Sequence, residues 1–425
     1  MFGKILNTFG TRSLAAVLNL LIAIILSQYI GPEGKGQQGL LITTIALILV
    51  FSNLVGGATL VYLVPRFKTS QLFLPSYFWS VMISLAAYGI VYAFPVISSE
   101  FTLHIAILSA INSFASINTT ILIGKEQIRQ ANFISLLQPL LIVVLLLIFF
   151  SLPAFINIYA YIIALYFSFG ISWLTGLFLL RKLPLLRDFR FRDSIQAIRD
   201  LFRYGFLNQL AHITQLLSFR LSYYILNSFH GEGSVGIYSN GIALMESVWL
   251  ISKSISLVQY ARIANLDDKS YSQSLTVRLL QVSLVFSLLI ILPLLILPAS
   301  AYVYIFGEGF SGIKTAMWAL APGVLIYNIN IIVGHYFSGT GKYQFNTLAS
   351  GIGLAVSLIS FYLLIPAFDV AGAGWATSIS YFATSLVILY FFRKDYSLLK
   401  SDWIFGKQGF RQIRQELRKV IHREK

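Results

Sequence analysis

The chain has 425 residues, of which 57% are hydrophobic and only 11% are charged, and its mean hydropathy is +0.77. It carries 31 Lys and Arg against 16 Asp and Glu, a net charge of +15, and no cysteine. A soluble protein needs roughly 25% charged residues to cover its surface. The composition therefore excludes a large soluble enzyme, a nucleic-acid-binding protein and a disulfide-stapled scaffold, and it indicates a chain whose main solvent is lipid.

Apolar runs of about 20 residues, the length that crosses a bilayer core, recur along the whole chain. An open sheet cannot satisfy its backbone in lipid and the runs lack the alternation of barrel strands, so we expect helices. The sequence predicts an all-α polytopic membrane protein with twelve transmembrane helices. In chain order they cover residues 11–30, 39–64, 74–96, 102–123, 131–151, 154–180, 202–229, 234–260, 279–297, 316–338, 346–366 and 371–392.

The cations are distributed very unevenly between the two predicted sides of the membrane. The N-terminus, the even-numbered connections and the C-terminal tail hold 27 of the 31, whereas the odd-numbered connections hold only Lys35 and Lys314. The remaining two, Arg220 and Lys253, lie inside predicted helices. By the positive-inside rule both termini are expected in the cytoplasm. The first apolar run is expected to act as an uncleaved signal-anchor.

The two halves of the chain share short motifs at equivalent points. LSQYIGPEGKG at 26–36 parallels LNSFHGEGSVG at 226–236, an offset of 200 residues, and GKEQ at 124–127 parallels GKYQ at 341–344. We interpret this as a duplication that produces two parallel six-helix lobes, 1–180 and 202–392. A basic cytoplasmic linker at 181–201 joins them, and a basic cytoplasmic tail follows at 393–425. Two such lobes with a substrate path between them are typical of transporters.

Several motifs together resemble those of polysaccharide transporters in the multidrug/oligosaccharidyl-lipid/polysaccharide (MOP) flippase superfamily. They are LSQYIGPEGKGQQGLL, GKEQIRQAN, RLSYYILNSFHGEGSVGIYS, YIFGEGF and AFDVAGAGWATSISY, in an order that covers nearly the whole chain. The resemblance implies a MATE/MOP-like fold and flipping of lipid-linked oligosaccharides from the cytoplasmic to the outer leaflet of the bacterial inner membrane. It also implies a basic, polar central cavity for the sugar-diphosphate headgroup. Many relatives have an Asp two residues after the Arg of the seventh helix, but here Ser222 follows Arg220.

Ionisable residues inside a membrane are costly and usually face a cavity. Here they are Arg220, Glu246 and Lys253, with Arg12 at the cytoplasmic mouth of the first helix. We expect the three cations to bind an anionic headgroup, because guanidinium and ammonium groups suit phosphate oxygens. Glu246 could couple transport to a proton or monovalent cation, or form a structural bridge with Arg220 or Lys253. Polar neighbours predicted to contact the sugar are Asn19, Asn208, Gln209, His212, Gln215 and His335.

The leading hypothesis is thus a flippase for undecaprenyl-diphosphate-linked oligosaccharide units in O-antigen, capsule or exopolysaccharide biosynthesis. Its expected partners are that lipid, the surrounding membrane lipids and other polysaccharide-assembly proteins. A cation-coupled multidrug exporter of the same superfamily is the close alternative. A membrane polymerase or ligase is disfavoured because every odd-numbered connection is short and gathers no acid–base residues. Nothing in the sequence predicts a catalytic residue, a metal site or a cofactor, and the Gly-rich turns lack the P-loop pattern.

Overall fold

The computed structural model describes residues 2–183, 191–265 and 268–395, and leaves a few side chains within helices undescribed, Asn208 among them. The described residues form helices without strands, which confirms the predicted all-α class. They divide into two compact units. Unit 1 comprises Met1–Asn240 with Ser300–Gly312, and unit 2 comprises Gly241–Ala299 with Ile313–Lys425. The lobe boundaries predicted at 180 and 202 stay a prediction.

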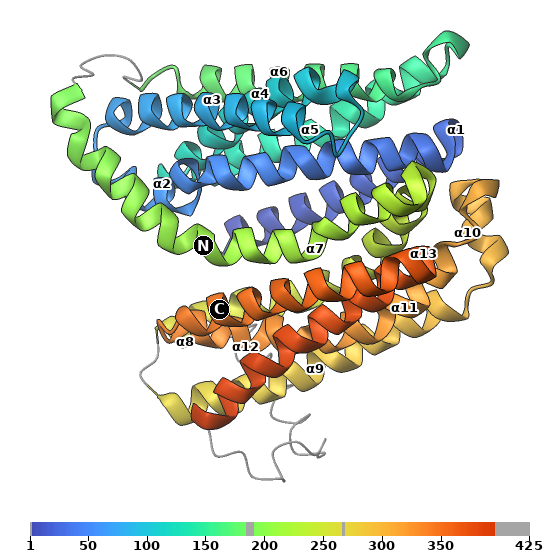
Figure 1. Cartoon of the computed structure of the whole chain (residues 1–425). Helices are drawn as coiled ribbons and strands as arrows, with labels where there is room; N and C mark the ends of the chain where they lie inside the picture. Colours follow the sequence, from blue (N-terminus) through green and yellow to red (C-terminus); the bar gives the residue numbers. More distant parts are fainter. Residues whose placement is uncertain (1, 184–190, 266–267, 396–425) are drawn as a thin grey trace. The chain divides into compact units, whose positions relative to one another are not determined.

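Unit 1 is built around the long helix α1 (Phe2–Gly56). Helices α3 (Thr69–Ala93), α4 (Thr102–Gly124), α5 (Ile128–Phe150) and α6 (Ile158–Leu180) all pack against it, as Figure 1 shows. The short α2 (Ala58–Leu63) packs on α4. The first part of α7 (Phe191–Ser247) and most of α10 (Ala299–Phe306) complete the unit. A buried cluster that includes Leu60, Ile121 and Leu201 joins the ends of these helices.

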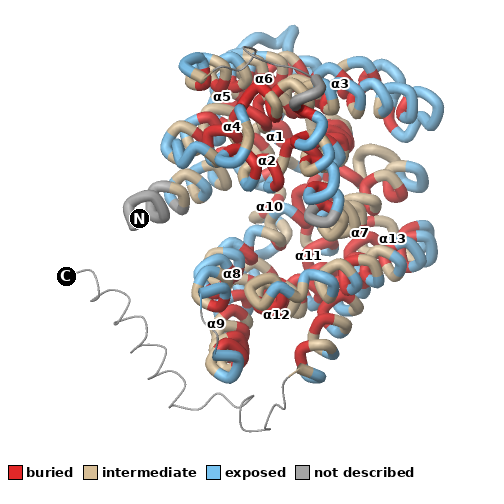
Figure 2. The backbone as a smooth tube through the Cα atoms, turned by 90° about the vertical axis from the view of Figure 1, so that its left-hand side faces the viewer, coloured by how far each residue is buried: buried red, intermediate tan, exposed pale blue. Residues whose placement is uncertain are grey.

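Unit 2 contains α8 (Trp249–Ala264), α9 (Lys269–Ile296), α11 (Ile313–Ile326), α12 (Asn328–Gly339) and α13 (Gln344–Asp395). Helix α12 packs against α8, α9 and α13, and α13 also lies along α11. Ile263, Val333, Phe337 and Phe392 lie in the buried core between α8, α12 and α13. In Figure 2 buried residues face the inside of each bundle and exposed ones face outwards. The outward side chains include large apolar ones such as Leu363, 69% exposed, as expected for a surface that meets lipid.

Three helices are too long for a single bilayer crossing, and each is broken once. At about 1.5 Å per residue the 55 residues of α1 would extend roughly 80 Å. Gly31 breaks α1 with φ 66°, and Gly231 breaks α7 with φ 80°. Both adopt the left-handed region that glycine enters without steric cost. Asp369 breaks α13 with φ 49° and ψ −128°.

Eight helical stretches of the described residues are long and apolar enough to cross a membrane, or nine if the bent pair α7–α8 counts as one span. The multi-pass membrane class is therefore confirmed. The three breaks lie at connections between predicted helices, namely the first and second, the seventh and eighth, and the eleventh and twelfth. The count of twelve crossings itself stays a prediction.

Local sequence explains where several helices begin. Asn157 caps α6, because its side chain accepts a hydrogen bond from the Tyr159 backbone N–H at 2.9 Å. Asp268 caps α9 in the same way, accepting from the Tyr271 N–H at 2.9 Å. Helix α7 begins at Phe191, so residues 191–201 of the predicted linker are helical, and Ala197 and Leu201 are buried in the core of unit 1.

Candidate functional site

The first part of α7 places several of the predicted substrate-binding residues in unit 1. Gln209 is buried and donates a hydrogen bond to the Asn53 carbonyl of α1 at 3.2 Å. His212 is exposed and Gln215 is half-buried. The Asn208 side chain lies outside the described residues. Gln209 therefore joins two helices, while His212 is available to a ligand.

Arg220 lies further along the same part of α7, before the break at Gly231. Its side chain is half-buried, with the guanidinium carbon 5.7 Å from the centroid of the Tyr223 ring. A guanidinium on an aromatic face is held in a preferred orientation, with its N–H groups pointing outwards past the edge of the ring. On α1, Arg12 and Asn19 are both exposed. Unit 1 thus holds two of the three predicted substrate-binding cations.

Unit 2 holds the third cation and the predicted coupling carboxylate, and a group of aromatic rings positions both. Trp249, Tyr327 and Tyr381 are buried and in mutual contact, with ring centroids 4.8–5.4 Å apart. The Tyr381 hydroxyl donates to the Glu246 carboxylate at 3.3 Å. The Lys253 ammonium lies 5.4 Å from the centroid of the Trp249 ring. No pattern in the sequence pointed to these three rings, because Trp249 is in α8, Tyr327 lies at the junction of α11 and α12, and Tyr381 is in α13.

Glu246 and Lys253 both lie in the predicted helix 234–260, and at seven residues apart they would share one face of it. The structure interrupts that helix: α7 ends at Ser247, α8 begins at Trp249, and the two are bent by 43°. The carboxylate and the ammonium therefore lie on opposite sides of a bend and are held by separate aromatic partners.

His335 has structural partners in unit 2. Its ring nitrogens lie 2.7 Å from the Ile331 carbonyl and 3.5 Å from the Ser256 hydroxyl, and its ring meets the edge of Tyr260. These contacts join α12 to α8. His335 is half-buried, so a part of its side chain is still open to a ligand.

Lys35 is a residue that the sequence analysis assigned to a connection and that the structure buries. It lies in α1 just after the Gly31 break and is 5% exposed. Its ammonium donates to the Gln38 amide oxygen at 2.7 Å and to the Ser239 hydroxyl at 3.0 Å. Gln38 in turn donates to the Tyr161 hydroxyl at 3.3 Å. The signal that could have identified Lys35 is its rarity, as one of two cations in the odd-numbered connections.

Two cations counted in the charge asymmetry also have a structural partner. The Asp395 carboxylate at the end of α13 forms ion pairs with the ammonium groups of Lys269 at 3.0 Å and Lys342 at 2.9 Å. It also accepts a hydrogen bond from the Tyr336 hydroxyl at 3.0 Å. Both lysines are partly exposed, so each bridge contributes little to stability. Together they hold the beginning of α9, the turn before α13 and the end of α13 at one place.

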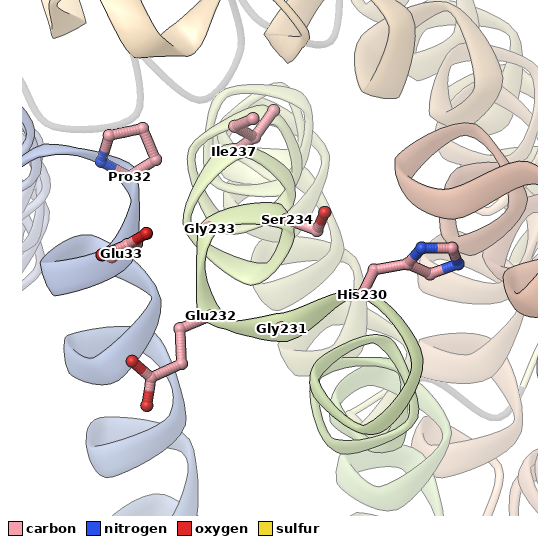
Figure 3. Close-up of a pocket in the computed structure, with 8 residues that line it drawn as sticks. All are labelled: Pro32, Glu33, His230, Gly231, Glu232, Gly233, Ser234 and Ile237. Atoms are coloured by element: carbon pink, nitrogen blue, oxygen red, sulfur yellow. The ribbon is translucent and has the colours of Figure 1, made fainter.

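A shallow pocket of about 470 Å³ lies in unit 1 where the broken ends of α1 and α7 meet. Figure 3 shows Glu33 on α1 and Glu232 on α7 lining it, with the His230 ring directed away from both carboxylates. Glu232 accepts a hydrogen bond from the Gln37 amide at 2.8 Å. Across the described part of the chain, no group of three or more His, Cys, Asp or Glu side chains could hold a metal ion.

Solved structures with the same arrangement of helices define the class of this protein. The inward closed conformation of the lipid II flippase MurJ matches with a TM-score of 0.74 at 15% identity, over 90% of this chain and 86% of the other. An inward-facing multidrug resistance MATE transporter of the MOP superfamily matches with a TM-score of 0.65 at 16% identity, over 90% and 94% of the two chains. The chain therefore has the fold of the MOP transporters.

The family follows from the sequence comparisons. The family model described as polysaccharide biosynthesis protein matches residues 4–252. This chain belongs to that family, as the quoted motifs led us to expect. It is 22% identical over 399 residues to the capsular polysaccharide biosynthesis protein CapF of Staphylococcus aureus, which covers 91% of this chain and 98% of CapF.

Two archaeal proteins match over about half of the chain. An uncharacterized membrane protein of Methanocaldococcus jannaschii is 28% identical over 220 residues, which are 50% of this chain and 43% of that protein. The probable low-salt glycan biosynthesis flippase Agl15 of Haloferax volcanii is 21% identical over 201 residues, or 46% and 42% of the two chains. The chain thus spans less than half the length of each of these two relatives.

Proposed function

We propose that this protein is a flippase that moves undecaprenyl-diphosphate-linked oligosaccharides from the cytoplasmic to the outer leaflet by alternating access. The observation that carries the proposal is the cation Arg220, half-buried on a predicted membrane-spanning stretch of α7 and steadied by the Tyr223 ring. Ionisable residues within membrane-spanning segments usually face a polar path. A diphosphate headgroup on such a path would present phosphate oxygens, which a guanidinium is well suited to bind.

The remaining predicted residues fit roles along that path. Arg12 and Lys253 are exposed cations on α1 and α8, suited to phosphate oxygens. His212 and Asn19 are exposed polar groups suited to sugar hydroxyls. The names of Agl15, a probable low-salt glycan biosynthesis flippase, and of MurJ, a lipid II flippase, support the same substrate class.

The protein is proposed to act as a transporter without catalysing a covalent step. It is proposed to lie in the bacterial inner membrane with both termini in the cytoplasm, as the cation asymmetry favours. Glu246 is the proposed site for a coupling proton or monovalent cation, and other polysaccharide-assembly proteins are proposed partners. The alternative is a cation-coupled multidrug exporter of the same superfamily, which would have a more acidic or apolar path than one bearing Arg220 and Lys253.

A reconstitution assay tests the proposal. The purified full chain is placed in liposomes with a fluorescent undecaprenyl-diphosphate-linked sugar, and a membrane-impermeant quencher reports the fraction of probe in the outer leaflet. We expect the protein to make the inner-leaflet pool accessible within minutes, while protein-free liposomes keep about half protected. Transport of a cationic dye with no movement of the lipid probe would favour the drug exporter and contradict the proposal.

A further inference from the structure

The two copies of the internal repeat contact each other inside unit 1. A Cβ atom on Gly36 of α1 would lie 1.8 Å from the Glu232 carbonyl oxygen of α7, and one on Gly236 would lie 2.0 Å from the Pro32 carbonyl oxygen. The two contacts are equivalent, because Gly36 corresponds to Gly236 and Pro32 to Glu232 at the repeat offset of 200 residues. Only glycine allows backbones to approach so closely. We call the contact between 32–36 and 232–236 the repeat crossing.

Lys35 interrupts the symmetry of the repeat crossing. The equivalent position in the second copy is Val235, which is fully buried. An apolar side chain is therefore sufficient for packing at this position. Lys35 instead buries an amine whose hydrogen-bond partners, Gln38 and Ser239, are neutral. Removing a lysine amine from water with only neutral partners beside it is unfavourable, so its presence requires a reason beyond packing.

One of the two partners of Lys35 belongs to the other copy. Gln38 is on α1 with Lys35, but Ser239 is on α7 beyond the Gly231 break. Separation of the repeat crossing would therefore remove Ser239 from the ammonium and leave Gln38 in place. An ammonium released in this way has free N–H donors and a full positive charge, and phosphate oxygens are strong acceptors for both.

We propose that Lys35 is a further phosphate-binding residue of the translocation path, hidden while the repeat crossing is closed and exposed to the lipid diphosphate when it opens. This inference rests on the proposed function. The carboxylates of Glu33 and Glu232 line the adjacent pocket, as Figure 3 shows, and their negative charge favours movement of an anion in one direction. They repel an anion that has passed Lys35 and so favour its departure from the protein.

The reconstitution assay measures the contribution of Lys35 through the probe concentration that gives half-maximal flipping. We expect Lys35→Met to raise that concentration by about tenfold or more, which corresponds to the free energy of one hydrogen bond to a charged group. Lys35→Arg, which keeps the charge, should stay within about threefold of the wild type. Lys314→Met is the matched control, because it removes the other cation of the odd-numbered connections, and we expect no change.

Two further variants separate binding from closure. Ser239→Ala weakens the closed contact but leaves the ammonium, so its half-maximal concentration should change less than that of Lys35→Met. The double variant Gln37→Cys with Glu232→Cys replaces two side chains whose terminal Nε2 and Oε2 atoms are 2.8 Å apart in a cysteine-free chain. A short bis-thiosulfonate crosslinker, which spans the gap left by the shorter cysteines, should stop flipping, and a reductant should restore it, because the repeat crossing must open.

Three results would overturn the inference. An unchanged half-maximal concentration in Lys35→Met, with only a lower maximal rate, would assign Lys35 to folding or closure. Normal flipping by the crosslinked double-cysteine variant would show that the repeat crossing stays closed during transport. If Lys35→Met fails to fold, Lys35→Gln gives the same test with a polar side chain. Failure of the wild type to flip the probe would instead contradict the proposed function, and this inference with it.

Discussion

Tyr381 of α13 donates a hydrogen bond to Glu246 at the end of α7, with 3.3 Å between the hydroxyl and carboxylate oxygens. The ring of Tyr381 is buried against Trp249, so the hydroxyl is held in place by packing. Replacing Tyr381 with Phe would keep the ring and remove the donor. We expect stability within about 1 kcal/mol of the wild type and a flipping rate lowered about threefold or more. Thermal unfolding and the liposome assay measure these, with the exposed Tyr390→Phe as control. Unchanged flipping would contradict a role for this bond.

Glu246 should decide how transport responds to an ion gradient if it is the coupling site. Glu246→Gln keeps the shape of the side chain and its contact with Tyr381 but removes the negative charge. We expect wild-type liposomes to flip faster when a proton or sodium gradient is imposed, and the variant to show the same rate with and without it. A variant that is destabilised but still responds to the gradient would assign Glu246 to a structural bridge.

Gly205 of α7 lies at a close approach between that helix and the end of α1. A Cβ atom there would lie 1.7 Å from the Leu54 carbonyl oxygen, so Gly205→Ala must push the helices apart. We expect a loss of about 2 kcal/mol, in the range of overpacked cores, read from thermal unfolding in detergent. Gly170→Ala is the control, because its Cβ would meet nothing within 4 Å. Equal stability of the two variants would contradict the close packing of α1 and α7.

The orientation in the membrane can be read by labelling, because the chain has no cysteine of its own. Ser99 and Gln196 are both exposed and lie on opposite sides in the predicted topology. Ser99→Cys should react with an impermeant maleimide on intact cells, and Gln196→Cys only after permeabilisation. The reverse pattern would overturn the cytoplasmic placement of the termini.

The sequence was informative about the fold because its strongest signals are local. Apolar runs located the membrane helices, and the Gly-Pro pair at 31–32 indicated the turn that breaks α1. Contacts between distant residues gave no such signal. Lys35 meets Ser239 across 204 positions, and Tyr381 meets Glu246 across 135, so neither pair could be recognised by spacing. The candidate residues were chosen because charges are rare in lipid, a rule that selects Arg220 but cannot say what holds it.

The proposed function is tested most directly by Arg220→Ala in cells that lack the native protein, measured as surface polysaccharide against accumulated lipid-linked precursor. With protein levels matched, we predict that the wild type restores export and Arg220→Ala lowers it about tenfold or more, with precursor accumulating on the cytoplasmic side. Arg220→Lys, which keeps the charge, should retain part of the export. Normal export by Arg220→Ala would contradict the claim that a cation on α7 receives the diphosphate headgroup.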